Sequence, residues 1–175
     1  MFQRRIIPFI GGEWRRETSD NLLDFFSAEK LRLVFPNIEP DHLKIVIDDC
    51  KDIISCYYLY KRELCKGTFA CIIEEDADKR ILSIHGGGVS SSFGDNLLLF
   101  RAYIAIVSAI LDDGYTLQTS CSNSNIRAIK FNYGVGFTPI AKKNKRVYMQ
   151  VNLSQLHQSV IYRYLNSERS THSEL

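Results

Sequence analysis

The segment from Gly86 to Asn96 is the part of this sequence that is best suited to bind a ligand. Gly86, Gly87 and Gly88 are followed by Val89, three serines and Gly94. Glycine has no side chain, so a ligand could approach this backbone closely. The N–H groups, the hydroxyls of Ser91 and Ser92 and the start of the next helix could bind a phosphate. The same residues could instead form a bulge and a turn, with Ser92 or Asp95 capping a buried helix.

Other kinds of site lack the residues that they need. His42, His157 and His172 are dispersed, with no cysteine or carboxylate at ligand spacing, so no metal site is predicted. The serines after Val89 lack the G-x-S-x-G frame of a nucleophile elbow. The basic segment from Lys142 to Arg146 indicates a hairpin turn, with a weaker claim to nucleic acid.

Length and composition indicate one globular domain. The chain has 175 residues, of which 45% are hydrophobic and 24% charged, and its formal charge of +2 calls for no polyanionic partner. The 5 cysteines form no CxxC pair, which favours free thiols in a reducing compartment. No secretory signal and no membrane span is predicted, so we expect a soluble, cytoplasmic protein. We expect the domain to cover residues 1–166 and a polar tail to cover residues 167–175.

The first half of the chain predicts one strand and two helices before a run of strands. The strand covers Ile6 to Ile10 and ends at Gly11 and Gly12. The first helix would run through Leu31 and the second would contain Leu43, Val46 and Ile47. Their predicted capping residues are Thr18, Ser19 or Asp20 for the first helix and Asp41 for the second.

The middle and the end of the chain predict a mixed sheet. Strands at Ser55 to Tyr60, Thr68 to Ile73 and Ile81 to His85 are joined by short polar turns, which indicates an antiparallel meander. A buried helix at Asn96 to Leu111 and a strand at Thr116 to Cys121 then fit a βαβ crossover. Further along, a helix follows Asn125, ends at Gly134 and Gly136, and leads into an extended run.

Four residues of this last segment match a known pattern. Asn125, Ala128, Gly136 and Phe137 have the spacing of the Asn-x-x-Ala…Gly-Phe segment in the GCN5-related N-acyltransferases. The order of elements around them is similar too, and the resemblance covers roughly Thr68 to Val151. It implies an α+β fold with a mixed, mostly antiparallel sheet, splayed between its fourth and fifth strands, and with helices on both faces.

The resemblance also implies acyl-coenzyme A, with acetyl-coenzyme A as the default, as co-substrate. Its pantetheine arm would lie in the splay, and its pyrophosphate would lie at the N-terminus of the helix after the fourth strand. The implied contacts are Ile84, Gly86, Gly87, Gly88, Ser91, Ser92, Gly94, Asn96, Asn125 and Arg127. The sequence departs from the family here, because its loop lacks the leading Arg or Gln and carries Asp95 near the expected pyrophosphate.

The implied chemistry is direct attack of an amine on the thioester. His85 is the candidate base at the end of the fourth strand, with Glu74 and Glu75 as carboxylate alternatives. The family's acid is often a tyrosine at the position of Asn132, so Tyr133 is the candidate acid here. Helix geometry rotates Tyr133 by about 100° from the family's position. Cys121 fits a buried, inert thiol better than a reactive one.

Three functions stay open at this point. The first is an N-acyltransferase that acts on an unknown small-molecule or peptide amine. The second is a catalytically degenerate protein of the same fold with a structural or assembly role, as in some phage virion proteins. The third is an acyl-coenzyme A sensor. A homodimer or an assembly partner is compatible with each, and no membrane partner is expected.

Overall fold

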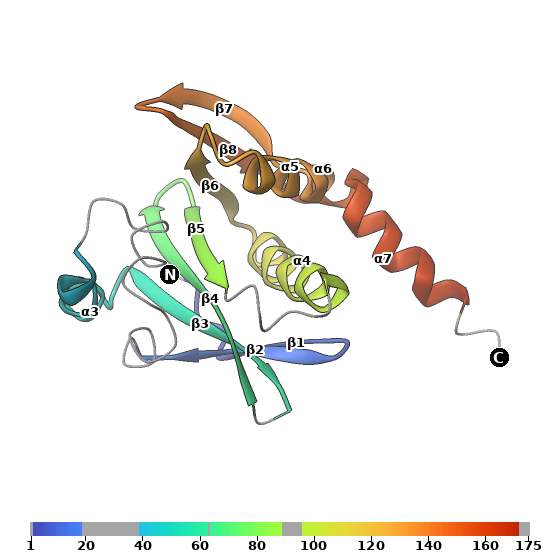
Figure 1. Cartoon of the computed structure of the whole chain (residues 1–175), viewed down its shortest axis with the longest axis horizontal. Coiled ribbons are helices and arrows are strands. Elements are labelled where there is room, and N and C mark those ends of the chain that lie inside the picture. The colour runs from blue at the N-terminus through green and yellow to red at the C-terminus, as the bar shows by residue number, and fades with distance from the viewer. Residues whose placement is uncertain (1, 19–38, 63, 89–95, 172–175) are drawn as a thin grey trace.

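The computed structural model describes residues 2–18, 39–62, 64–88 and 96–171 (Figure 1). These residues form an eight-stranded sheet in the order β1-β2-β3-β4-β5-β6-β8-β7. Only β5 and β6 pair in parallel, and the other neighbours are antiparallel. The strands are β1 Ile6–Phe9, β2 Gly12–Glu17, β3 Ile54–Lys61, β4 Leu64–Asp76, β5 Ile81–Gly88, β6 Thr116–Ser122, β7 Thr138–Lys143 and β8 Arg146–Val151.

Helices cover both faces of this sheet, which confirms the predicted fold class (Figure 1). On one face, α3 (Pro40–Asp49) buries Leu43 and Ile47 against cysteine and aromatic side chains of β3 and β4. On the other face, α4 (Asn96–Asp112) packs over the larger core. This core also includes residues of α5 (Ile126–Val135), α6 (Leu153–Gln158) and α7 (Val160–Thr171).

The apolar run predicted as a buried helix is α4, and its burial is confirmed. Ala102, Ile106, Val107 and Ile110 have no exposed surface. A helix that is apolar on most sides needs cover on most sides, and here the sheet, α6 and α7 supply it. The Trp14 indole also contacts this helix, with Nε1 donating to the Ala102 carbonyl at 2.7 Å.

Two hairpin turns are explained by residues with positive φ. Gly11 has φ +102° between β1 and β2, and the second strand of this hairpin was not predicted. Asn144 and Lys145 have φ +50° and +58°, as a two-residue turn between β7 and β8 requires. The predicted hairpin at Lys142 to Arg146 is therefore confirmed.

The helix ends confirm some predictions and correct others. Asn125 caps α5, and Gly136 ends it with φ +102°, whereas Gly134 lies inside the helix instead of ending it. Helix α3 begins one residue earlier than its predicted cap, because Glu39 is the N-cap and Pro40 has the favoured first position. The helix predicted up to Leu31 lies outside the described residues. Helix α7 extends through Thr171 into the predicted tail.

Candidate functional site

Strands β5 and β6 separate shortly after they begin to pair. Their register joins Ile81 with Thr116 and ends with Ser83 and Gln118. Beyond this pair, β5 continues to Gly88 along β4, and β6 continues to Ser122 along β8. We call the space between the diverging strands the fork. Its position agrees with the divergence predicted near His85 and Cys121.

The main chain of every second residue faces the fork. The N–H of Thr116 donates to the Arg80 carbonyl at 2.9 Å, so even-numbered residues on both strands face each other. The Ile84 carbonyl accepts a hydrogen bond from Thr119 Oγ1 at 3.0 Å, which closes the base of the fork. The next main-chain groups that face it belong to Gly86 on β5 and Ser120 on β6. They are placed to pair with an extended ligand.

Gly86 is required by its close packing against β4. A Cβ atom on this residue would lie 2.9 Å from the Phe69 carbonyl oxygen. The residue is nevertheless exposed, so its backbone is accessible to a ligand. Gly87 and Gly88 continue β5 opposite Phe69 and Thr68. Three of the predicted glycine contacts therefore lie along one edge of the fork.

The structure places the other predicted cofactor contacts in different positions. Asn125 Oδ1 accepts a hydrogen bond from the Ala128 N–H at 3.1 Å, which confirms the cap and leaves cofactor binding as a prediction. Arg127 is exposed on the same helix. Asn96 is the first residue of α4. The positions predicted for the phosphate loop, Ser91, Ser92, Gly94 and Asp95, lie outside the described residues.

His85 lies on the sheet face that α3 covers, opposite Cys71 of β4. Burial lowers its pKa below the usual histidine value, the nearby Glu75 carboxylate acts to raise it, and the Arg146 charge acts to lower it further. A β-bulge between Glu74 and Asp76 lets Glu75 accept a hydrogen bond from Ser83 Oγ at 2.5 Å. The lowered pKa keeps the imidazole neutral at pH 7, as a base requires.

Helix α5 places Asn132 and Tyr133 in different surroundings. Asn132 is buried, whereas Tyr133 is 50% exposed. The aromatic side chains that pack between α4 and α5 are Phe131, Phe100 and Tyr103, with ring centroids 5.4 Å and 4.9 Å from Phe131. Tyr133 remains a candidate acid only because its side chain is accessible.

The Cys121 thiol and the Arg146 guanidinium also lie beside the fork. Cys121 is 9% exposed, and burial raises its pKa while the Arg146 charge acts to lower it. Arg146 Nε and Nη2 donate to Ser120 Oγ at 3.2 and 3.0 Å. The sequence assigned Arg146 to a turn and gave it no role at the site. Its alternation with the buried Val147 and Met149 is the signal that places it on the opposite sheet face.

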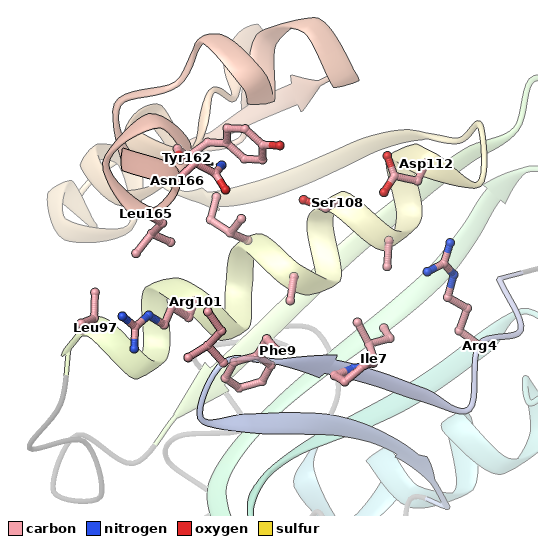
Figure 2. Close-up of a pocket in the computed structure, with 15 residues that line it drawn as sticks. Arg4, Ile7, Phe9, Leu97, Arg101, Ser108, Asp112, Tyr162, Leu165 and Asn166 are labelled. Atoms are coloured by element: carbon pink, nitrogen blue, oxygen red, sulfur yellow. Dashed lines mark hydrogen bonds between the residues drawn. The ribbon is translucent and has the colours of Figure 1, made fainter. Parts of the chain in front are cut away.

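A separate groove lies away from the fork, between β1, α4 and α7. It has a volume of about 910 Å³ and is lined by Ile7 and Phe9 from β1 on one side and by Leu165 from α7 on the other (Figure 2). Arg101 lies towards one end and Arg4 towards the other.

Within the described residues, no cluster of three potential metal ligands occurs. No helix in those same ranges is long and apolar enough to cross a membrane.

The arrangement of strands and helices resembles that of many solved acetyltransferase structures. A GCN5-related N-acetyltransferase from Brucella melitensis has a TM-score of 0.70 at 12% identity, covering 95% of this chain and 86% of that chain. The ribosomal alpha-N-protein acetyltransferase RimL in complex with coenzyme A gives 0.64 at 12% identity, covering 86% and 99%. AAC(6')-Ib in complex with ribostamycin and coenzyme A gives 0.60 at 18% identity, covering 83% and 95%.

Sequence comparison adds nothing to this likeness, since no family model and no curated protein matches the chain. The structural likeness extends over most of both chains. The predicted recognition is thereby confirmed at the level of the fold. This chain has the fold of the GCN5-related N-acetyltransferases.

Proposed function

We propose that this protein is an acyl-coenzyme A-dependent N-acyltransferase that transfers an acyl group, by default acetyl, to an amine. The observation that carries the proposal is the fork, where accessible main chain at Gly86 faces a gap between parallel strands. The coenzyme A complexes of RimL and AAC(6')-Ib, which share the fold, support the same co-substrate.

The fork fits the pantetheine arm of this co-substrate. The arm is extended and carries amide groups, so it can pair with strand backbone as another strand would. Gly86 and Gly88 offer such backbone without side chains on β5, Gly87 between them faces β4, and Ile84 lies at the closed end. Asn125 and Arg127 would contact the cofactor from α5, and Ser91, Ser92, Gly94 and Asn96 would bind its phosphates.

His85 would serve as the base in this reaction. The attacking amine must lose a proton as its nitrogen bonds to the thioester carbon, and a neutral imidazole can accept that proton. Main-chain groups of β5 would polarise the thioester carbonyl. Tyr133 would protonate the departing sulfur, and an unchanged turnover of Tyr133→Phe would remove it from that role.

Ligand-induced stabilisation tests this proposal first. Acetyl-coenzyme A at 100 times its Kd should raise the free energy of unfolding by about 2.7 kcal/mol and raise the melting temperature accordingly. Release of free thiol with a panel of small amines and peptide N-termini would then show transfer. No shift at millimolar acetyl-coenzyme A would contradict both catalysis and sensing.

A protein of the same fold without catalysis is the alternative, and one observation favours it. The position of the family's tyrosine holds Asn132, whose side chain is buried and cannot act as a phenol. Binding of acetyl-coenzyme A without thiol release for any amine would indicate a sensor. Absence of binding would favour a structural or assembly role, in which a second copy or another protein is the partner.

A further inference from the structure

Arg146 brings a positive charge across β6 to the edge of the fork. It is the first residue of β8, and its Nη2 donates to the Ser120 carbonyl at 3.0 Å in addition to its bonds with Ser120 Oγ. Ser120 is one of the residues whose main chain faces β5. The guanidinium therefore lies over the edge of β6 that the fork exposes.

This charge has no anionic partner in the part of the chain that the structure describes. The hydrogen bonds of its guanidinium go to the neutral Ser120, and Nη1 donates to none of the described residues. A half-buried cation without a counter-ion is costly, because it loses hydration and gains no Coulomb attraction. Among the described residues, no carboxylate pairs with this guanidinium, so an anionic ligand group could do so.

Groups on both strands sense the charge. It acts to lower the pKa of His85 on β5, where burial is the larger cause of the lowered pKa. It also acts to lower the pKa of Cys121 on β6, against the larger, opposite effect of burial. An anion that formed between the two strands would be stabilised by the same field.

We infer that Arg146 is a catalytic residue that stabilises the negative charge formed on the thioester during acyl transfer. The inference rests on the proposed function, since an acyl thioester must lie in the fork. It assigns to β8 a role that the sequence pattern of a hairpin turn did not suggest.

The electron movements show where this charge is needed. The amine lone pair forms the C–N bond, and the carbonyl electron pair moves to oxygen. When the intermediate collapses, the C–S bond breaks and its electron pair leaves on sulfur as a thiolate. The amine proton goes to His85, and the thiolate takes a proton from Tyr133 or from solvent. Arginine stays protonated throughout, so its contribution is electrostatic.

This role compensates for the tyrosine that the family pattern has and this chain lacks. A thiol with a pKa of about 8.5 is a moderate leaving group even without prior protonation. A nearby guanidinium makes the thiolate a better leaving group, and a tyrosine at the position of Asn132 is then dispensable. Arg146 and Asn132 would be two parts of one departure from the family.

Binding of coenzyme A compared with desulfo-coenzyme A tests the inference without any acceptor. The two ligands differ only at the thiol, so the ratio of their Kd values reports on that group. Between pH 7 and 9 the wild-type ratio should rise about tenfold or more in favour of coenzyme A, as the thiolate forms beside Arg146. Arg146→Gln should abolish most of this rise, and Arg146→Lys should retain part of it. Arg163→Gln, which removes an exposed arginine from α7, is the matched control.

The neighbouring protein groups should not titrate between pH 7 and 9, the range of this experiment. His85 on β5 has a lowered pKa and remains neutral above pH 7. Burial raises the pKa of Cys121 on β6 and of Tyr103 on α4, so neither loses its proton early. The Glu75 carboxylate on β4 is a further charged group near His85 within the described residues. The bound thiol is then the group whose titration the ratio records.

The possible results separate the two claims. A rise in the wild type that Arg146→Gln removes supports the inference. A flat wild-type ratio, or the same rise in Arg146→Gln, overturns the inference and leaves the proposed function standing. If neither compound binds, the proposed function fails and the inference fails with it. Turnover, where it occurs, should fall by about 100-fold or more in Arg146→Gln.

Discussion

At the scale of single residues, the surroundings of His85 should determine how the reaction depends on pH. Burial lowers the pKa of its imidazole, the Glu75 carboxylate acts to raise this pKa, and the Arg146 charge acts to lower it further. If neutral His85 is the base, kcat/KM should fall only below a midpoint lower than about 6.5, the usual histidine value. His85→Gln should lower kcat/KM by about 100-fold or more and remove this acidic limb.

The control for this experiment is His42→Gln, because His42 is exposed at the start of α3. Its pH–rate profile should match the wild type. An unchanged profile in His85→Gln would exclude His85 as the base, and Glu75 would become the group to test.

The same pKa shift predicts how stability depends on pH. The folded state resists protonation of His85, whereas the unfolded chain takes up that proton below about pH 6.5. The unfolded state then binds more protons, so stability falls as the pH falls from 7 to 5. The decline in melting temperature should be smaller in His85→Gln than in His42→Gln. An equal decline in both variants would contradict the proposed environment of His85.

At the scale of elements, the end of α5 offers a matched pair of glycines. Gly136 has φ +102°, and a Cβ there would lie 2.5 Å from the Gln155 carbonyl oxygen. Gly136→Ala should lower the free energy of unfolding by about 2 to 4 kcal/mol. Gly134 lies inside the helix, where a Cβ would meet the movable end of Ile161 at 2.8 Å. Gly134→Ala should change stability by less than about 1 kcal/mol.

Chemical denaturation of both variants measures this difference. Equal losses of stability would mean that Gly136 does not end the helix in the left-handed conformation. The comparison also tests a prediction that the structure corrected, because the sequence assigned the end of the helix to both glycines.

Elements with strong local signals could be predicted from the sequence. The apolar run of α4 is a continuous stretch of sequence, and the cap and stop of α5 are each explained by one residue type at one position. Strand β2 was missed because Trp14 is its one buried residue and charged side chains surround it. The bulge that turns Glu75 towards Ser83 leaves no mark in the sequence that could be recognised.

At the scale of the whole molecule, the site depends on register between distant strands. The pairing of β5 with β6 joins residues more than 30 positions apart, and that of β6 with β8 brings Arg146 to Ser120. Local patterns do not encode such a register, so the contribution of Arg146 to the fork could not be predicted. The fork itself was predicted, through the resemblance of Asn125, Ala128, Gly136 and Phe137 to a known pattern.

Backbone amide exchange measured by NMR, with and without acetyl-coenzyme A, tests the central claim most directly. The claim is that the fork binds the pantetheine arm through main-chain groups. The N–H groups of Gly86 and Ser120 face the fork and should be protected by the ligand. Those of His85 and Gly87 face β4 and should change little. Protection confined to the groove between β1, α4 and α7, or none at saturating ligand, would contradict the account.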